Sequence, residues 1–283
     1  MTDIRQMIEL NKRQSSFYDS VCSASDYSEN LSTNSITRLW ASLRNAQIRA
    51  TEKAGLKKVK RAKHLEWVQQ SSGKRFLELG CFTGSDLTMD LAHQATSFVA
   101  VDLSPLALRD LEEKLKKQDL FDKCELVVGD ILEVPLSETF DVIYAHGVLH
   151  HFEDPEPVFA KIHSWLSPHG RLILTEPLAI NPFYRIMRSI YRPFQGDREW
   201  EWPFTRNTVN TLEKFVKFED GFGWGRHSLL VSLLCGLPVI GNAAFKLYRR
   251  LLEKEQRMGL SSAAWQNSYI TLLASPKTKL NAS

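Results

Sequence analysis

The sequence has few cysteines, and they form no recognisable group. Its 283 residues include four cysteines, with no CxxC pair and no histidine at metal-ligand spacing. This scatter argues against a zinc site and against a disulfide framework, and it favours a reducing compartment. The opening residues are polar and charged and have no apolar stretch of signal-peptide length, which argues against secretion. We therefore expect a cytoplasmic protein without a bound metal.

The sequence also has little excess of either charge sign, because the formal net charge is only +3. Residues 44–63 are the exception, with eight lysines and arginines against one glutamate. Such a run is typical of the solvated face of a helix, and an anion-binding patch is the alternative. No aromatic residue lies between Trp40 and Trp67, so a base-stacking surface is not indicated. Nucleic acid is not the expected partner.

The most informative stretch is FLELGCFTG at residues 76–84. A short apolar run typical of a buried parallel strand ends in a turn, where Gly80 and Gly84 let the backbone approach a ligand. Residues 98–101 form a second apolar run, which ends at Asp102. Open α/β sheets bind ligands at the carboxyl ends of their strands, so Asp102 is placed to accept ribose hydroxyls.

One residue of this turn departs from the dinucleotide-binding pattern. Phe82 stands where GxGxxG requires the glycine that admits a pyrophosphate. A ligand with a ribose but no pyrophosphate is therefore favoured over a nicotinamide cofactor. Downstream follow an apolar run ending at Asp130, a strand at 140–145, the segment GVLHHF at 147–152, a helix over 155–166 and a strand at 171–175.

Together these motifs resemble, in register over roughly residues 74–178, the class I S-adenosylmethionine (SAM)-dependent methyltransferases, especially small-molecule enzymes of the ubiquinone-biosynthesis-like subgroup. The resemblance implies an α/β, Rossmann-like seven-stranded mostly parallel sheet with helices on both faces and SAM as the methyl donor. It also implies that residues 1–73 form an N-terminal helical lid, that 179–267 form a helical and aromatic cap insertion, and that 268–276 form an antiparallel final strand, within one structural domain.

By this resemblance Asp102 binds the ribose, Asp130 faces the adenine amino group and Ile131 packs on its ring. Glu78 orients the glycine turn or meets the methionine amino group, and Ala145, His146 and Gly147 border the sulfonium. Phe17, Tyr18 and Tyr27 either contact the cofactor or simply anchor the arm that carries them. The residues expected at the cofactor are Tyr18, Glu78, Gly80, Phe82, Gly84, Asp102, Leu103, Asp130, Ile131 and Ala145.

Methyl transfer from a sulfonium needs alignment more than acid–base chemistry. A base matters when the acceptor is a phenol, an alcohol or a protonated amine, and a neutral histidine is the usual candidate. The candidates for catalysis are His146, His150 and His151, with Glu176 at the end of the fifth strand. A structural or capping role for His150 and His151 is the alternative.

The acceptor side is expected in residues 178–226, which are rich in aromatic side chains. Residues 228–245 follow with no charge over 18 positions, interrupted by glycine and proline. This length is at the lower edge of a membrane span. The segment is interpreted as either a buried cap or a lipid-facing surface, in which case 183–204 and 228–250 would make a peripheral membrane contact.

The predicted function is methyl transfer to a small or amphipathic organic acceptor, most readily to oxygen. N- or C-methylation and a non-catalytic SAM-binding module are the alternatives. A nicotinamide oxidoreductase and an RNA methyltransferase are less favoured.

Overall fold

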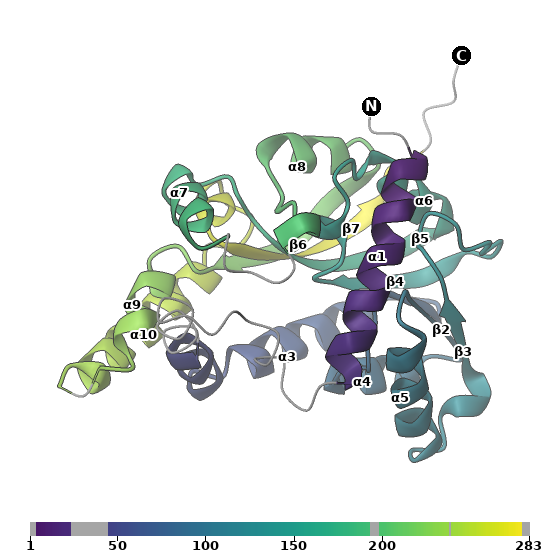
Figure 1. Cartoon of the computed structure of the whole chain (residues 1–283), viewed down its shortest axis with the longest axis horizontal. Coiled ribbons are helices and arrows are strands. Elements are labelled where there is room, and N and C mark those ends of the chain that lie inside the picture. Colours follow the sequence, from purple (N-terminus) through teal and green to yellow (C-terminus); the bar gives the residue numbers. More distant parts are fainter. Residues whose placement is uncertain (1–3, 24–44, 193–197, 238, 279–283) are drawn as a thin grey trace.

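A seven-stranded sheet forms the centre of the molecule (Figure 1). The computed structural model describes residues 4–23, 45–192, 198–237 and 239–278. The strand order is β3-β2-β1-β4-β5-β7-β6. The strands are β1 (Arg75–Leu79), β2 (Ser97–Asp102), β3 (Cys124–Val128), β4 (Phe140–His146), β5 (Leu166–Pro177), β6 (Val216–Trp224) and β7 (Tyr269–Pro276).

Strands β1 to β5 run parallel to one another, while β7 is antiparallel to both β5 and β6. The prediction of a seven-stranded, mostly parallel sheet with an antiparallel final strand is thus confirmed. Parallel strands are buried on both faces when crossover helices cover them. All their carboxyl ends meet at one edge, which is where the candidate site lies.

Helices cover both faces of the sheet, as predicted. Leu77 and Leu79 of β1 pack into one core with Ile162, whereas Phe76 packs into the other with Leu91 and Leu111. The alternation along β1 follows from the two-residue period of a strand. The flanking helices are α3 (Leu56–Gln69), α4 (Asp86–Gln94), α5 (Pro105–Lys116), α6 (Glu156–Trp165) and α8 (Arg206–Leu212), with short 3-10 turns at Phe121–Lys123 (η2), Leu149–His151 (η3), Arg198–Trp200 (η5) and Ala264–Gln266 (η6).

Local signals place the helices that follow the ligand-binding turns. Ser104 caps α5 by accepting a hydrogen bond from the Ala107 N–H, and Pro105 occupies the first turn, where proline is favoured. Ser85 caps α4 in a reciprocal capping box with Thr88. These caps fix where each helix begins, and therefore fix the turns after β1 and β2.

The N-terminal segment, expected to be a lid, begins with α1 (Ile4–Ser23), which lies across the front of the sheet in Figure 1. The basic run of 44–63, expected on a helix, lies mostly in helical residues 45–53 and in α3. Gly55, at φ 75°, separates the two because this left-handed conformation suits glycine. Arg44 lies outside the described residues.

The region expected as a cap contains more sheet than the sequence suggested. Residues 216–224 form β6 at the edge of the sheet, so Phe218, Phe222 and Trp224 belong to the sheet. The remainder holds α7 (Pro182–Tyr191), α9 (Ser228–Leu234) and α10 (Gly241–Gln256). Within the described ranges, none of the helices combines the length and the apolar character needed to cross a membrane.

Candidate active site

A cavity of about 310 Å³ opens at the carboxyl ends of β1, β2 and β4. This is the edge at which open α/β sheets bind ligands. One wall comes from α1 and the others from the turns after the strands. The lining residues are Gln14, Tyr18, Val21, Gly80, Phe82, Val101, Asp102, Leu103, Gly129, Asp130, Ile131, His146, Gly147, Val148, His151 and Phe152.

Asp102 lies in the wall of this cavity with its carboxylate fixed by the backbone. Oδ2 accepts a hydrogen bond from the Phe82 N–H at 2.7 Å, and Oδ1 accepts one from the Ser104 N–H at 2.9 Å. Burial raises the pKa of Asp102, and these backbone hydrogen bonds oppose the rise. Each carboxylate oxygen can accept more than one hydrogen bond, so Asp102 has capacity left for the two hydroxyls of a ribose.

The turn after β1 approaches the cavity closely. Gly80 has φ 63°, and a Cβ there would lie 2.6 Å from Cγ2 of Val148, so only glycine fits. Phe82 has φ 47°, a left-handed conformation unusual for a bulky residue. The hydrogen bond from the Phe82 N–H to Asp102 holds this conformation, and the Phe82 ring packs edge-on against Tyr18. The backbone at position 82 thus keeps a conformation that suits glycine, although the residue is phenylalanine.

Gly84 is part of the turn but not of the cavity wall. A Cβ at Gly84 would meet Cδ1 of Leu111 at 2.6 Å, and the φ of Gly84 is 73°. Its role in the structure is to let the turn pack against α5. Ala145 likewise lies within β4, where its side chain is buried in the core, and the neighbouring His146 and Gly147 are the residues that line the cavity.

Glu78 lies behind the glycine turn. Its Oε1 accepts a hydrogen bond from Thr88 Oγ1 at 3.0 Å, while its buried Oε2 has no hydrogen-bond partner among the described residues. Burial raises the pKa of Glu78 to about 8, and the negative charge of Asp102 adds to the rise. The contact with Thr88 fits the predicted orienting role. The unsatisfied acceptor beside the turn also fits a ligand that carries an amino group.

Replacement of Glu78 by glutamine is expected to change how stability depends on pH. An acid whose pKa is higher in the folded state stabilises the fold below its unfolded pKa near 4.5, and this contribution is lost as pH rises toward about 8. Between about pH 5.5 and about pH 7, the wild type should lose about 2 kcal/mol of unfolding free energy relative to Glu78→Gln. Urea denaturation of the ligand-free proteins measures this difference. The exposed substitution Glu125→Gln is the control, and parallel pH curves for wild type and Glu78→Gln would contradict the expectation.

Helix α1 is held across the cavity by polar contacts. Asn11 Nδ2 donates to Asp130 Oδ2 at 2.8 Å, and Ser15 Oγ donates to the Leu103 carbonyl at 2.8 Å. The Leu132 N–H donates to Asp130 Oδ1 at 2.8 Å, so both oxygens of Asp130 are engaged. Burial raises the pKa of Asp130 as well. Tyr18 lines the cavity, whereas Tyr27, the other tyrosine expected on this arm, lies outside the described residues.

His146 faces the cavity, but its ring nitrogen already has a partner. Lys60 Nζ lies 3.1 Å from His146 Nε2. The imidazole borders the cavity and is accessible from it, but protein atoms fill most of the space around the ring. This burial and the charge of Lys60 lower the pKa of His146 to about 3, and burial lowers the pKa of Lys60 to about 8. A neutral His146 whose Nε2 accepts from an ammonium group is poorly placed to act as a base.

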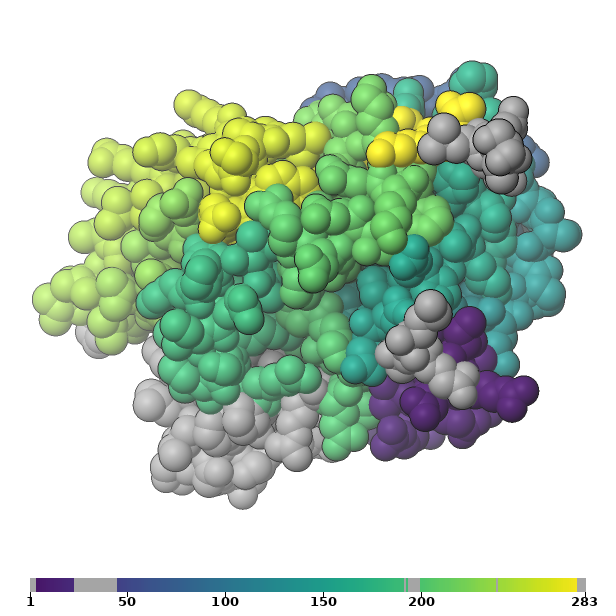
Figure 2. Space-filling model, turned by 90° about the horizontal axis from the view of Figure 1, so that it is seen from above, coloured from purple at the N-terminus to yellow at the C-terminus, as the bar shows by residue number. Residues whose placement is uncertain are grey.

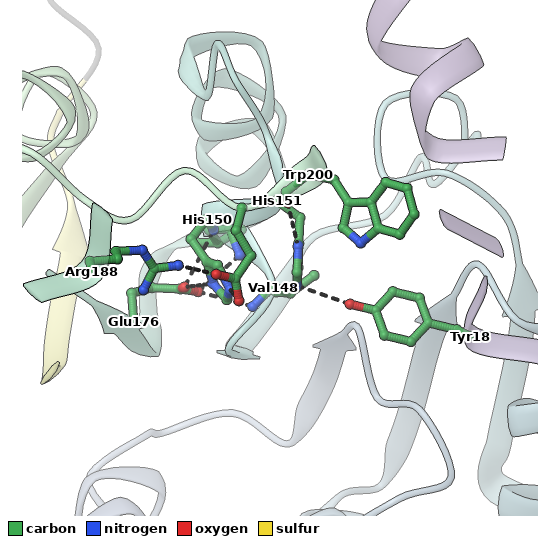
Figure 3. A network of polar contacts seen from close by, with 9 residues as sticks. Tyr18, Val148, His150, His151, Glu176, Arg188 and Trp200 are labelled. Atoms are coloured by element: carbon green, nitrogen blue, oxygen red, sulfur yellow. Dashed lines mark hydrogen bonds and ion pairs between the residues drawn. The ribbon is translucent and has the colours of Figure 1, made fainter. Parts of the chain in front are cut away.

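Glu176 lies behind the cavity wall, fully buried. Its Oε1 accepts the N–H groups of Val148 and Leu149 at 3.2 and 2.9 Å, and its Oε2 is 2.7 Å from His150 Nδ1 (Figure 3). Burial raises the pKa of Glu176 to about 7. His150 Nε2 lies 3.9 Å from Glu201, which pairs with Arg188. Glu176 and His150 are thus absent from the cavity lining, and Glu176 anchors the turn that carries His151.

His151 points toward the cavity. Its Nδ1 is 2.7 Å from the Trp200 carbonyl oxygen, and its Nε2 is 3.2 Å from the Tyr18 hydroxyl (Figure 3). A carbonyl can only accept, so in the neutral imidazole Nδ1 carries the proton and Nε2 is the acceptor. The Tyr18 hydroxyl then donates to Nε2. Of the four residues proposed for catalysis, His151 is the one that combines a place in the cavity wall with a basic nitrogen held by a hydroxyl.

Several residues at the site were not expected from the sequence. Asn11 and Gln14 lie on α1 and are each 2% exposed. A signal existed, because Met7, Asn11, Gln14 and Tyr18 follow helical spacing, and two amides in such a stripe indicate buried polar partners. Lys60 belongs to the basic run, and nothing in the neighbouring sequence indicated its contact with His146.

The rest of the basic run is largely engaged with the protein itself. Lys57 pairs with Asp86, Arg61 with Asp90, and Lys63 with Glu66 and Asp220. The helical interpretation of this run therefore holds for α3, and these paired side chains offer little to a polyanion.

Comparisons with known proteins agree with this geometry. Residues 77–172 match the family described as "Methyltransferase domain". The mitochondrial ubiquinone biosynthesis O-methyltransferase of Schizosaccharomyces pombe is 31% identical over 105 residues, 37% of this chain and 38% of that protein. Demethylspheroidene O-methyltransferase of Rhodobacter capsulatus is 33% identical over 118 residues, 41% of this chain and 28% of that protein. The chain thus spans less than half the length of these relatives.

A solved structure shares the fold. The geranyl diphosphate C-methyltransferase of Streptomyces coelicolor, in complex with Mg²⁺, geranyl diphosphate and S-adenosyl-L-homocysteine, superimposes with a TM-score of 0.55 at 14% identity. The match covers 78% of this chain and 80% of that one. Residues 77–172 thus match a methyltransferase domain, and the sheet around them has the fold of a solved methyltransferase.

Proposed function

We propose that the protein transfers a methyl group from SAM to an oxygen atom of a small or amphipathic organic acceptor. The observation that carries the choice of oxygen is His151, whose basic Nε2 faces the cavity while its Nδ1 is fixed on the Trp200 carbonyl. An alcohol or phenol must lose a proton as it is methylated, and an oriented neutral imidazole can take that proton. The names of the two curated relatives, both O-methyltransferases, support the same choice.

The chain supplies residues that would hold the donor. When bound, SAM provides an activated sulfonium methyl group for direct displacement. We assign the ribose hydroxyls to Asp102, an adenine contact to Asp130 and Ile131, and the amino group to the glycine turn beside Glu78. Gly80 and Phe82 line the cavity, and we assign to their backbone a direct contact with the ligand. Helix α1 forms the wall on this side of the cavity.

The acceptor is assigned to the second cavity. This cavity measures about 490 Å³ and shares Phe152 with the donor cavity. Leu149 and Trp202 give it apolar walls, and charged side chains of both signs line the rest, among them Arg185 and Glu153. Such a combination suits an amphipathic acceptor with an apolar body and a polar group. The lining comes mostly from 179–211, within the region that the sequence assigned to the acceptor.

The experiment that tests this function is transfer of isotope-labelled methyl groups from SAM into a cell extract, with the labelled product identified by mass and fragmentation. We expect label in a small amphipathic molecule as an O-methyl ether or ester. Label on nitrogen or carbon would support the alternative that the family also offers. Label in RNA or protein would contradict the small-molecule proposal.

The non-catalytic alternative is tested by the same preparation. A SAM-binding module would bind S-adenosylhomocysteine in calorimetry but transfer no label to any component of the extract. The orientation of His151 favours the catalytic proposal, because a basic nitrogen that faces the donor cavity serves methyl transfer and is not needed for binding alone.

A further inference from the structure

Helix α7 is amphipathic, but its apolar face is the one exposed to solvent. Phe183, Ile186 and Ile190 are 52%, 60% and 62% exposed. The opposite face carries Arg185, Arg188, Ser189 and Arg192, which line the second cavity. A surface helix of a soluble protein normally turns its apolar stripe toward the core. Here the apolar stripe of α7 faces outward.

A second apolar projection lies at the same end of the molecule. Helices α9 and α10 pack on each other and extend from the sheet, at the left of Figure 1, on the side opposite β3 and α5. Val239, in the turn between them, is 94% exposed. Figure 2 shows α7 and α10 on the same side when the molecule is seen from above. Further exposed apolar side chains here are Leu230, Leu234, Leu237, Ile240 and Leu247.

The concentration of these side chains is specific to this end. Of thirteen large apolar side chains that are exposed among the described residues, nine lie in 182–192 or 228–250. We call these two segments the apolar end. Singly exposed apolar residues are ordinary, whereas a gathered set marks an interaction site.

The charges at the apolar end all have one sign. The sequence of 182–192 and of 228–250 contains no aspartate or glutamate, but it contains six arginines and lysines. Lys246 and Arg250 are exposed on α10, one turn apart and next to the exposed Leu247. Apolar side chains flanked by cations, without carboxylates, complement a surface of apolar chains and anionic headgroups.

We propose that the apolar end docks the protein onto an anionic phospholipid bilayer. Helix α7 lies in the interface with Phe183, Ile186 and Ile190 among the acyl chains, and the α9–α10 turn inserts Val239. The described helices of this end have 10, 7 and 16 residues, too short to span a bilayer. The inference concerns an interaction surface and does not rest on the methyl-transfer activity.

A bilayer is favoured over a second copy of the chain by shape and charge. The α9–α10 turn projects from the sheet and carries Val239, which is 94% exposed, whereas a self-complementary dimer surface must match itself about a two-fold axis. Two copies would also bring the exposed Lys246 and Arg250 of each copy to one surface, where like charges repel.

The test is sedimentation of the full chain with phosphatidylcholine vesicles that contain phosphatidylglycerol, compared with phosphatidylcholine alone. Wild type is expected to sediment with the anionic vesicles, and less so as salt is added. Ile186→Ser with Ile190→Ser should lower the partition coefficient on the order of tenfold or more. The matched control is Ile4→Ser with Val128→Ser, which removes two exposed apolar side chains elsewhere and should bind like wild type.

A second variant separates charge from apolar burial. Lys246→Gln with Arg250→Gln should weaken binding to anionic vesicles by about fivefold or more and leave binding to neutral vesicles unchanged. Calorimetry with S-adenosylhomocysteine checks that each variant keeps its fold. The proposal is overturned if wild type does not bind vesicles or if the Ile186/Ile190 variant binds like wild type. A dimer that this variant dissociates would assign the surface to a second copy instead.

Discussion

Asp102→Ala is expected to weaken the binding of SAM by 2–4 kcal/mol, which is about 30- to 1000-fold. The loss has two parts, because Asp102 is placed to accept charge-assisted hydrogen bonds from the ribose and also holds the Phe82 N–H. Without that contact, the left-handed conformation of Phe82 loses its anchor. Isothermal titration with SAM or S-adenosylhomocysteine measures the change.

The matched control is Asp122→Ala, an exposed aspartate on η2. It should leave the affinity within about twofold, since surface substitutions away from a site have small effects. Thermal unfolding of Asp102→Ala establishes that the variant is folded. A folded Asp102→Ala protein with wild-type affinity would show that the ribose is bound elsewhere.

His151→Asn is expected to reduce kcat for an oxygen acceptor by about 10²- to 10⁴-fold, the usual contribution of a positioned base. Asparagine can keep a donor near the place of Nδ1, and so the hydrogen bond to the Trp200 carbonyl, but it offers nothing at the place of Nε2. The KM for SAM should therefore change little. Initial rates with the acceptor identified by label transfer measure the effect.

His150→Asn provides the matched comparison. It preserves a donor toward Glu176 and lies outside the donor-cavity lining, so its kcat should remain well above that of His151→Asn. The acidic limb of the pH–rate profile should also disappear in His151→Asn but persist in His150→Asn. Equal losses in the two variants, or a His151→Asn rate within about threefold of wild type, would contradict the assignment of the base.

The parts of the fold that the sequence predicted best are those with local signals. The run from Phe76 to Gly84 combines an apolar strand with glycines that need φ above zero, and Ser104 with Pro105 marks the start of α5. Asp102 follows an apolar strand directly, so its place at the sheet edge needs no knowledge of distant residues. The seven-stranded, mostly parallel sheet then follows from the resemblance of the whole set of motifs.

Strand β6 was missed because its pattern is broken. Its register against β7 shifts between Phe218 and Asp220, so the alternation of apolar and polar residues fails in the middle of the strand. Gly221 and Gly223 weaken the strand signal further, although a Cβ at Gly221 would meet the Thr271 carbonyl oxygen at 2.6 Å. The aromatic residues that suggested an acceptor surface are in part the packing of this strand.

The roles within the site depended on contacts between distant segments. Asn11 and Asp130 are 119 residues apart, and Lys60 and His146 are 86 apart. His150 and His151 are neighbours in sequence, yet one turns toward Glu176 and the other toward the cavity. The sequence predicted these chemical groups, but their directions are set by the turn that Glu176 anchors.

The outward apolar face of α7 also could not be read from periodicity alone. An amphipathic pattern has the same period whether the apolar stripe faces the core or the solvent. The absence of acidic residues from 182–192 was the available hint. The position of Arg188, paired with Glu201 beside the second cavity, shows which face turns inward.

The most direct test of the central claim is a crystal structure of the protein with S-adenosylhomocysteine. We expect the ligand in the cavity at the carboxyl ends of β1, β2 and β4, with both ribose hydroxyls within hydrogen-bond distance of the Asp102 carboxylate and with Nε2 of His151 facing the sulfur side of the cavity. A ligand bound away from Asp102, or a His151 turned out of the cavity with the ligand in place, would contradict the account.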